Sequence, residues 1–554
     1  MLDVRVIGAD WHITYSLRQY VAMTLRLRVL SFEAREGSAI YPIPEGVTVI
    51  VGGNNSGKSR LLRDIHDMLS LPESSPVVLT TMQIERPTSE AQEPAEQLAE
   101  AEEWLRRRMY RIGTNAAGQD LYSGVTGASG LTALELVQQL AANGYPLWLL
   151  SAASVFVKRI AAGSMTTYAA SAGIAGNAAA TDPVSEIHAD GDLEAALSSL
   201  STETFGVSLT FDRVNTPPRL RVGRILGDAP PFDHPTREYR DEVRGLPALE
   251  DQGEGMKSFV GHALTLSSRP VDVMLIDEPE AFLHPPQARA LGRWIGQQAA
   301  RQRIQVITAT HDRDFVLGLV NSGEPVTLLR LTRSGNVNSI RQLSPEVVEK
   351  TFSDPVLRYS NVLQGLFHSR VVLCEYDSDC RFFGAALDDL GDRTGRRFEV
   401  DDCLFVPTGG KGDSVKFVRA LAALGIETTV IFDFDGIDDR KRLKAIVEAH
   451  GHEWDIELDE VWNTVNTAVT QGPTWPMAKN SGLAAIPAGK PRQAADALLS
   501  RLASAGILII HVGEMEDFDK AIAVRKSPWV NEALSKKVHS SREVAAFVTR
   551  IITT

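Results

Sequence analysis

Cysteines and long apolar runs are scarce in this sequence. The 554 residues include three cysteines, an odd number without the spacing of metal ligands, which favours a reducing compartment over a disulfide framework. No apolar run reaches the roughly 20 residues that a membrane helix requires. The N-terminal segment MLDVRVIGADWHITYSLRQY does not join a basic stretch to an apolar core and a small-residue cleavage site. We therefore predict a cytoplasmic protein with no membrane span and no secretory signal.

Positive charge is also in deficit. Lysine and arginine together number 57 against 70 aspartates and glutamates, so the formal net charge is -13. Such a chain does not wrap a polyanion with its whole surface, but the charge does not exclude a local basic groove or a metal-mediated contact with phosphate. Hydrophobic residues at 44% and charged residues at 23% are near the average of globular proteins. The length predicts two to four domains.

A glycine-rich turn stands between a predicted strand and a predicted helix. The sequence GGNNSGKS satisfies the pattern G-x-x-x-x-G-K-[ST]; the apolar segment VTVIV precedes it, and LLRDIHDML follows with helical spacing. Backbone N–H groups of such a turn surround phosphate oxygens. Lys58 is expected at the β- and γ-phosphates of ATP and Ser59 at magnesium. The predicted nucleotide-binding residues are Gly52, Asn54, Asn55, Ser56, Gly57, Lys58 and Ser59.

Two further strands end in polar residues that suit ATP hydrolysis. VDVMLIDEP places Asp277 where it could hold the metal through water, and Glu278 where it could polarise the attacking water. RIQVITATHD places His311 after another strand, where it could contact the γ-phosphate. Pro285 and Pro286 open a helix between the two strands. Together these segments predict an α/β ATPase core.

The segments GGNNSGKS, DQGEGMKS, LIDEPEAFLHP and THD, in this order, resemble the ABC-type ATPases of the SMC, RecF and overcoming-lysogenization-defect (OLD) group. The resemblance implies that Gly253, Gly255 and Ser258, within a signature at Gln252–Ser258, face ATP bound by the other protomer. It implies a homodimer or higher homo-oligomer formed through the ATPase domain. The signature departs from the usual LSGGQ, and a plain loop before the helix KSFVGHALTL is the alternative.

A second group of acids follows two later strands. Glu375 and Asp379 follow VVLC, and Asp433 and Asp435 follow TTVIF, so these carboxylates are expected to converge at one edge of a parallel sheet. Hard oxygen ligands suit Mg²⁺, with Mn²⁺ as an alternative. Two such ions could activate water and stabilise the leaving oxygen of a phosphodiester. Capping or solvated acids at strand-to-helix turns are the alternative.

The order Glu375, PTGGKGD, Asp433-Phe434-Asp435 resembles the Toprim fold of topoisomerases, primases and OLD-family nucleases over about residues 371–525. The resemblance implies that Glu375, Asp433 and Asp435 bind metal and that Asp379 is the last acid of an E-G-x-x-D pattern. Tyr376 stands where that pattern has glycine.

Three acids and one lysine extend this predicted centre. Glu516 resembles the late metal-binding acid of OLD-type nuclease domains, with Glu514 and Asp517 as competitors. Lys411, in the glycine-rich loop, could neutralise the scissile phosphate, or could be an exposed loop lysine.

The predicted fold is α/β: an ABC-type P-loop ATPase domain at 1–350, a linker at 351–370, a Toprim-like parallel α/β domain at 371–525 and a helical tail at 526–554. An inserted helical or dimerisation region is expected at about 85–250, with a structural extension as the favoured role. The arginines from Arg106 to Arg111 could contact nucleic acid, but a solvated helix face fits their acidic surroundings better.

The joint resemblance implies an ATP-regulated, metal-dependent endonuclease of OLD type in anti-phage defence. DNA is favoured over RNA as the substrate, and a defence-system partner protein is expected. The alternative is an ATP-dependent sensor or assembly protein that holds or releases a partner effector and whose Toprim domain binds metal without cutting. The tyrosine at position 376 motivates this alternative.

Overall fold

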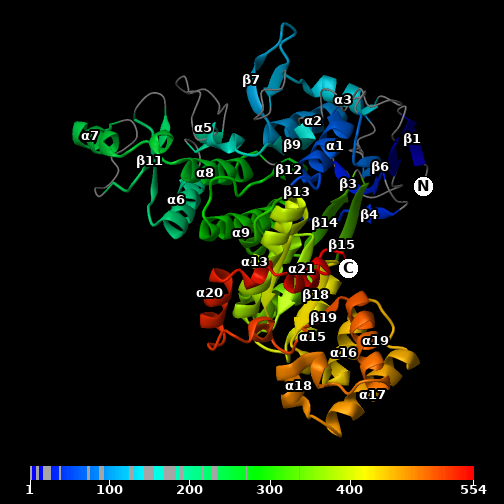
Figure 1. Ribbon diagram of the computed structural model, residues 1–554. Coiled ribbons are helices and arrows are strands. Elements are labelled where there is room, and N and C mark those ends of the chain that lie inside the picture. The colour runs from blue at the N-terminus through cyan, green and yellow to red at the C-terminus, as the bar shows by residue number, and fades with distance from the viewer. Residues whose placement is uncertain are drawn as a thin grey trace. The chain divides into compact units, whose positions relative to one another are not determined.

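The computed structural model describes residues 3–7, 12–16, 26–35, 39–70, 75–85, 93–123, 130–141, 155–167, 183–187, 191–214, 218–225, 234–269, 271–335 and 337–553. The chain divides into two compact units, Met1–Glu349 and Lys350–Thr554. In Figure 1 the first unit runs from blue to yellow-green and the second from yellow-green to red. Each unit contains parallel strands, which confirms the α/β fold class.

A six-stranded sheet forms the centre of the first unit. The strand order is β15-β14-β5-β13-β12-β9, and the strands are parallel except for the pair β14–β15. Every residue of β5, β12 and β13 is buried, because helices cover both faces of a parallel sheet. The strands are β5 (Val47–Val51), β9 (Val157–Ile160), β12 (Val273–Asp277), β13 (Gln305–Ala309), β14 (Val326–Ser334) and β15 (Val337–Leu343).

The helices around this sheet bring the nucleotide motifs to one edge. Helix α1 (Lys58–Ser70) follows β5, α9 (Pro285–Gln302) follows β12, and α10 (Arg313–Val320) follows β13. Prolines occupy the first turn of α9, as predicted. Because β5, β12 and β13 are parallel neighbours, the residues after their carboxyl ends meet at the same edge.

The range 85–250 is not one insertion outside the ATPase core. Strand β9 lies within it and pairs with β12 at the edge of the central sheet, a parallel pairing that the local pattern could not reveal. The other elements in this range are α2 (Pro94–Arg108), β7 (Tyr110–Thr114), β8 (Asp120–Ser123), α3 (Ala133–Ala141), α5 (Pro183–Glu186), α6 (Gly191–Phe205), β10 (Leu209–Asp212), β11 (Arg219–Val222) and α7 (Arg237–Gly245).

A second sheet of the first unit has five strands in the order β1-β2-β6-β3-β4. Its strands are β1 (Asp3–Ile7), β2 (His12–Ser16), β3 (Arg28–Ala34), β4 (Ile40–Pro42) and β6 (Leu79–Glu85). Buried residues of β3, β6 and α1 belong to one hydrophobic cluster with β5 and β12. Helix α8 (Glu254–Ser267), which carries Gly255 and Ser258 of the predicted signature, also belongs to this unit.

The second unit is built on a four-stranded parallel sheet in the order β17-β16-β18-β19. The strands are β16 (Arg370–Cys374), β17 (Cys403–Pro407), β18 (Glu427–Phe432) and β19 (Ile507–Ile509). The loops after β16, β17 and β18 carry Glu375, Lys411 and Asp433, which therefore lie at one edge of the sheet.

Helices connect and cover these strands. They are α12 (Pro355–Tyr359), α13 (Asp377–Thr394), α14 (Arg397–Asp401), α15 (Ser414–Ala423), α16 (Arg440–Ala449), α17 (Ile456–Thr470), α18 (Trp475–Ser481), α19 (Lys490–Ser504), α20 (Ser527–Ser535) and α21 (Arg542–Thr549), while α11 (Pro345–Ser353) contains the boundary between the units. The range 351–370, expected as a linker, contains α12. Helices α20 and α21, in the expected tail, bury Trp529 and Phe547 in the same core as Phe382 and Phe383 of α13.

No helix within the described ranges is long and apolar enough to cross a membrane.

Candidate functional site

The glycine-rich turn of the first unit has a backbone that requires its glycines. Gly52 has φ 153° and Gly57 has φ 100°, in the region that residues with a Cβ atom rarely adopt. A Cβ atom on Gly52 would lie 2.1 Å from the carbonyl oxygen of Leu331. Lys58 Nζ donates hydrogen bonds to the carbonyl oxygens of Gly52 and Gly53, each at 2.9 Å. The turn thus holds the lysine ammonium at the start of α1.

Ser59 and Asp277 lie together, although they are far apart in the sequence. Ser59 Oγ donates to Asp277 Oδ1 at 2.9 Å. Burial raises the pKa of Asp277. Burial also lowers the pKa of Lys58, although the negative charges of Glu278, Glu280 and Asp277 act to raise it. A hydroxyl and a carboxylate at this distance fit magnesium held beside a bound triphosphate.

Glu278 and His311 face each other beside the turn. Glu278 has φ 46°, and its N–H donates to the carbonyl oxygen of Ala309 at 2.9 Å. His311 Nδ1 lies 3.1 Å from Glu278 Oε1. An open cleft joins Glu278 to the phosphate-binding turn and is lined by Asn54, Asn55, Ser56, Gly57, Lys58, Ser59, Arg60, Glu278 and Arg333. A carboxylate at the edge of this cleft is placed to polarise water near a γ-phosphate.

The sequence motifs did not indicate Glu280 or Arg333. Glu280 is buried and accepts hydrogen bonds from Thr310 Oγ1 at 2.6 Å and from the His311 N–H at 3.1 Å. Burial raises the pKa of Glu280 to about 7. Glu280 therefore fixes the backbone that carries His311. Arg333 comes from the end of β14 and enters the cleft only because β14 pairs with β5.

The predicted signature residues occupy different environments. Gly253 is exposed at the N-cap of α8, and a Cβ atom on Gly255 would lie 2.6 Å from the carbonyl oxygen of Phe282. Ser258 is completely buried, and its Oγ has no hydrogen-bond partner among the described residues. The serine hydroxyl therefore does not lie on a surface that a nucleotide of another protomer could reach, contrary to the expectation for Ser258.

The arginines near the end of α2 pair with carboxylates of their own unit. Arg111 lies 2.7 Å from Asp120, Arg106 lies 3.4 Å from Glu102, and Arg107 and Arg108 form ion pairs with Glu103 and Asp272. These pairs favour the interpretation of this segment as an ion-paired surface rather than a nucleic-acid contact.

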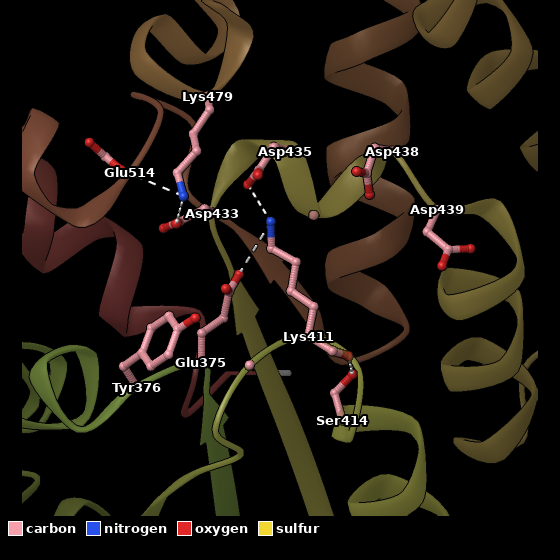
Figure 2. Close-up of polar contacts among 12 residues, drawn as sticks. Glu375, Tyr376, Lys411, Ser414, Asp433, Asp435, Asp438, Asp439, Lys479 and Glu514 are labelled. Atoms are coloured by element: carbon pink, nitrogen blue, oxygen red, sulfur yellow. Dashed lines mark hydrogen bonds and ion pairs between the residues drawn. The ribbon is translucent and has the colours of Figure 1, made fainter. Parts of the chain in front are cut away.

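Three of the predicted acids of the second unit converge. Glu375 follows β16, while Asp433 and Asp435 follow β18, and one carboxylate oxygen from each lies within 4.8 Å of the others. Figure 2 shows the three side chains at the carboxyl ends of these strands. Lys411 Nζ lies 2.5 Å from Asp435 Oδ1 and 3.7 Å from Glu375 Oε1. The glycine-rich loop after β17 thus brings its lysine into the acidic cluster.

The donor set of this cluster fits a divalent cation. Glu375 Oε1 and Asp435 Oδ1 are buried and, within the described part of the chain, face the Lys411 ammonium without a hydrogen bond from a neutral donor. Such oxygens keep lone pairs for a hard ion. Burial raises the pKa of Glu375, and burial followed by the charge of Glu375 raises the pKa of Asp433 to about 7. Carboxylates held this close together need a cation to be fully ionised.

The raised pKa values predict a pH-dependent metal affinity. Because the pKa of Asp433 is about 7, its carboxyl group keeps a proton below that pH, and a protonated carboxyl group does not bind a cation. We expect the affinity for Mg²⁺ to rise about tenfold between pH 6 and pH 8 and to level off above. Isothermal titration calorimetry without nucleotide measures this, with Asp433→Asn/Asp435→Asn as the blank. Equal dissociation constants at both pH values would contradict the prediction.

Asp379 lies beside this three-residue cluster but not in it. Its Oδ2 accepts a hydrogen bond from the Tyr376 N–H at 2.9 Å, which closes the first turn of α13. Burial, then the charges of Asp433 and Glu516, raise the pKa of Asp379 to about 7. Tyr376 has an extended backbone with φ -134°, so this turn does not require the glycine of the usual pattern.

Of the late acids, Glu514 pairs with a lysine that also binds the cluster. Glu514 is buried, and its Oε2 lies 3.7 Å from Lys479 Nζ, which in turn lies 3.3 Å from Asp433 Oδ2. Glu516 Oε1 instead accepts the N–H of Lys526 at 2.8 Å, and Asp517 Oδ2 accepts the N–H of Glu514 at 3.1 Å. Burial lowers the pKa of Lys479, but the charges of Asp433 and its neighbours outweigh this and raise it.

Two segments of the chain match known protein families. Residues 187–318 match the family described as "AAA domain, putative AbiEii toxin, Type IV TA system". Residues 366–435 match "Overcoming lysogenization defect protein-like, TOPRIM domain". The first segment contains Asp277, Glu278 and His311, and the second contains Glu375 and Asp435.

Two curated proteins are related to this chain. The "OLD nuclease" of Thermus scotoductus is 28% identical over 242 residues, which are 40% of this chain and 43% of the relative. The "Molybdenum import ATP-binding protein ModC" of Photobacterium profundum is 25% identical over 164 residues, which are 25% of this chain and 45% of the relative. The chain therefore spans less than half the length of either relative.

Similar solved structures include a SMC head bound to the C-winged helix domain of ScpA, at 13% identity and a TM-score of 0.34, covering 59% of this chain and 99% of that one. Another is cbiO1 from Clostridium perfringens, at 13% identity and a TM-score of 0.27, covering 58% of this chain and 89% of that one. Scores this low do not establish a common overall fold.

The fold and the two sites define a class: an α/β P-loop ATPase domain, which matches an AAA family model, followed by a Toprim domain. Its Toprim segment matches the OLD-like family, and an OLD nuclease is among its relatives, so the chain is similar to OLD-family ATPase–Toprim proteins.

Proposed function

We propose that this protein binds and hydrolyses ATP and cuts nucleic acid at its Toprim centre with Mg²⁺ or Mn²⁺. The convergence of Glu375, Asp433 and Asp435 within 4.8 Å carries this proposal. The OLD nuclease relative supports the reaction class. DNA is the favoured substrate over RNA, and defence against phage, with a partner protein, is the favoured role.

The acidic cluster would hold the cation, and its neighbours would handle the phosphate. A bound divalent ion lowers the pKa of water and polarises a phosphoryl oxygen. Lys411, which lies 2.5 Å from Asp435, would then donate a hydrogen bond to a non-bridging oxygen of the scissile phosphate. The oxygen of water would form a bond to phosphorus and lose a proton to solvent, while the bond from phosphorus to the leaving oxygen would break and that oxygen would take up a proton from solvent.

ATP would control this centre through the assembly of two chains. Lys58, Ser59 and Asp277 would bind the phosphates and magnesium, and Glu278 would polarise the attacking water. The exposed start of α8 at Gly253 supports contact with ATP on a second protomer, because a helix N-terminus favours phosphate. If ATP binds one dimer arrangement more tightly, its hydrolysis changes access to the Toprim centre.

A cleavage assay tests the proposal. Purified protein is incubated with supercoiled DNA, linear DNA and RNA, with Mg²⁺ or Mn²⁺, with and without ATP, beside the Asp433→Asn/Asp435→Asn variant. We expect metal-dependent cutting that this variant lacks, and the effect of ATP gives the direction of control. If no substrate is cut while ATP is hydrolysed, the sensor or assembly function becomes the better interpretation.

Lys411→Ala is expected to reduce cleavage about 10- to 100-fold, since a hydrogen bond to a charged group contributes about 1.5–3 kcal/mol. The same change should tighten Mg²⁺ binding, because it removes a cation that lies 2.5 Å from Asp435. Cleavage rates and calorimetry measure the two effects.

Lys416→Ala is the matched control for this prediction. Lys416 lies on α15, just after the same loop, and pairs with Asp354 at 2.8 Å rather than with the cluster. Its loss should change neither quantity. Unchanged cleavage by the Lys411 variant would exclude the phosphate contact.

A further inference from the structure

Glu280 makes hydrogen bonds whose direction the structure fixes. The Thr310 hydroxyl accepts the Asp312 N–H at 2.9 Å, and it donates its own proton to Glu280 Oε1 at 2.6 Å. The His311 N–H donates to the same oxygen at 3.1 Å. Oε1 is therefore the acceptor in both contacts, and it joins the turn after β12 to the turn after β13.

The second carboxylate oxygen of Glu280 makes no such contact. Oε2 is buried and has no hydrogen-bond partner among the residues that the structure describes, and the residue as a whole is 6% exposed. A proton on Oε2 would leave both contacts of Oε1 in place. Burial raises the pKa of this carboxyl group to about 7, so near neutral pH Glu280 changes its charge without changing its hydrogen bonds.

The ring of His311 lies beside two carboxylates. Its Nδ1 is 3.1 Å from Glu278 Oε1 and 3.5 Å from Glu280 Oε1. Because ionised carboxylates only accept hydrogen bonds, a ring with a proton on Nδ1 suits both neighbours, whereas a lone pair on Nδ1 would face two negative oxygens. Nε2 is then the ring nitrogen left for a nucleotide.

Three titratable groups face Glu280 from the elements around it: His311 after β13, Lys58 at the start of α1 and Glu278 in its own turn. Asp312 directs its carboxylate elsewhere, to the N–H of Phe315 in α10. Lys58 donates its hydrogen bonds to carbonyl oxygens of the phosphate-binding turn, so the charge of Glu280 is not needed to hold the lysine. That charge therefore acts on the ring of His311.

We propose that Glu280 is a positioning residue in ATP hydrolysis: its negative charge keeps the proton of the His311 ring on Nδ1, beside Glu278. The inference rests on the proposed ATPase activity. When Glu280 takes up a proton, the ring loses one of its two charged neighbours, and its proton exchanges between Nδ1 and Nε2. Hydrolysis then slows, whereas ATP binding, which Lys58 and Ser59 provide, does not change. Since the charge is present above pH 7 and absent below it, hydrolysis rises with pH.

The pH profile of ATP hydrolysis tests this inference. We would measure kcat and KM of the full chain with Mg²⁺ from pH 6 to pH 8, for the wild type and for Glu280→Gln, whose neutral side chain has the shape of the protonated one. We expect the wild-type kcat to rise about tenfold, with its midpoint near pH 7. Glu280→Gln should stay at the low value throughout, with KM unchanged. An inflection that persists in Glu280→Gln belongs to His311 or another group and overturns the inference, as does a flat wild-type profile.

Two further variants separate charge from folding. Glu324→Gln neutralises an exposed carboxylate in the loop after α10, and it should keep the wild-type profile. If Glu280→Gln does not fold, Glu280→Asp decides, because it keeps a carboxylate in an altered position. An inflection with a displaced midpoint supports the inference, and any other profile overturns it.

The position of the ring proton is measured without ATP hydrolysis. Nitrogen-15 NMR of the histidine-labelled full chain at pH 8, with His311→Gln to assign the resonances, shows which ring nitrogen carries the proton. We expect Nδ1 in the wild type and a mixture of both forms in Glu280→Gln, and the same form in both proteins overturns the inference. A wild type that carries the proton on Nδ1 but hydrolyses no ATP contradicts the ATPase activity and leaves the effect of Glu280 on the ring intact.

Discussion

Replacing Asp433 and Asp435 together by asparagine is expected to abolish metal-dependent cleavage while ATP hydrolysis continues. The two side chains supply two of the three clustered carboxylates, and the amide groups that replace them carry no charge to hold a divalent ion. Metal-assisted activation is worth several kcal/mol, so the cleavage rate should fall about a thousandfold or more. Rates of DNA cleavage and of phosphate release from ATP, measured on the same preparation, give both effects.

Asp438→Asn/Asp439→Asn is a matched control for this variant. Asp438 pairs with Arg442 at 2.8 Å, and Asp439 accepts the Arg442 N–H at the start of α16. Figure 2 shows both side chains apart from the three clustered acids. Asparagine keeps the capping oxygen, so cleavage should persist. A cleavage activity that survives in the Asp433/Asp435 variant would come from a contaminant or from another site, and it would remove the Toprim centre from the mechanism.

Glu278→Gln is expected to slow ATP hydrolysis about 10²- to 10⁴-fold, the range for loss of a general base, with ATP binding retained. Lys58, Ser59 and Asp277 keep their contacts in this variant, so the phosphates and magnesium are still held. Only the carboxylate that faces the cleft and lies 3.1 Å from His311 is neutralised. Single-turnover hydrolysis and binding of a fluorescent ATP analogue separate the two steps.

Two comparison variants define the outcome for Glu278. Lys58→Ala should lose binding as well as hydrolysis, and Glu324→Gln, an exposed carboxylate in the loop after α10, should change neither. If Glu278→Gln hydrolyses ATP at the wild-type rate, another group polarises the water. If the Glu278→Gln variant forms a stable dimer in the presence of ATP, the cleavage activity of that variant shows whether the ATP-bound state opens or closes the Toprim centre.

Local sequence patterns were sufficient to predict those site residues that directly follow a strand. The phosphate-binding turn, Asp277-Glu278 and Asp433-x-Asp435 each follow a buried apolar strand, and parallel strands deliver their carboxyl ends to a common edge. The sequence therefore predicted that Ser59 meets Asp277 and that Glu375 meets Asp433 and Asp435. For Lys411 it left two roles open, a contact with the scissile phosphate and an exposed loop lysine; the fold brings its ammonium to 2.5 Å from Asp435.

Other features depended on contacts between distant segments. Arg333 enters the cleft because β14 pairs with β5, and β9 joins the central sheet by pairing with β12. The burial of Ser258 depends on what packs over α8, and no local motif reports that.

The sequence by itself predicted two kinds of strand–turn–helix motif, one that binds a nucleoside triphosphate and one that binds a divalent cation, since the polar residues of each turn are few and consecutive. Only the tertiary structure decided that Lys479 reaches Asp433 and that Glu514, rather than Glu516, pairs with this lysine. The physical reason is that a lone lysine on a helix has no periodicity or spacing of its own. These contacts arise when α18 packs against the turn after β19, which long-range packing alone specifies.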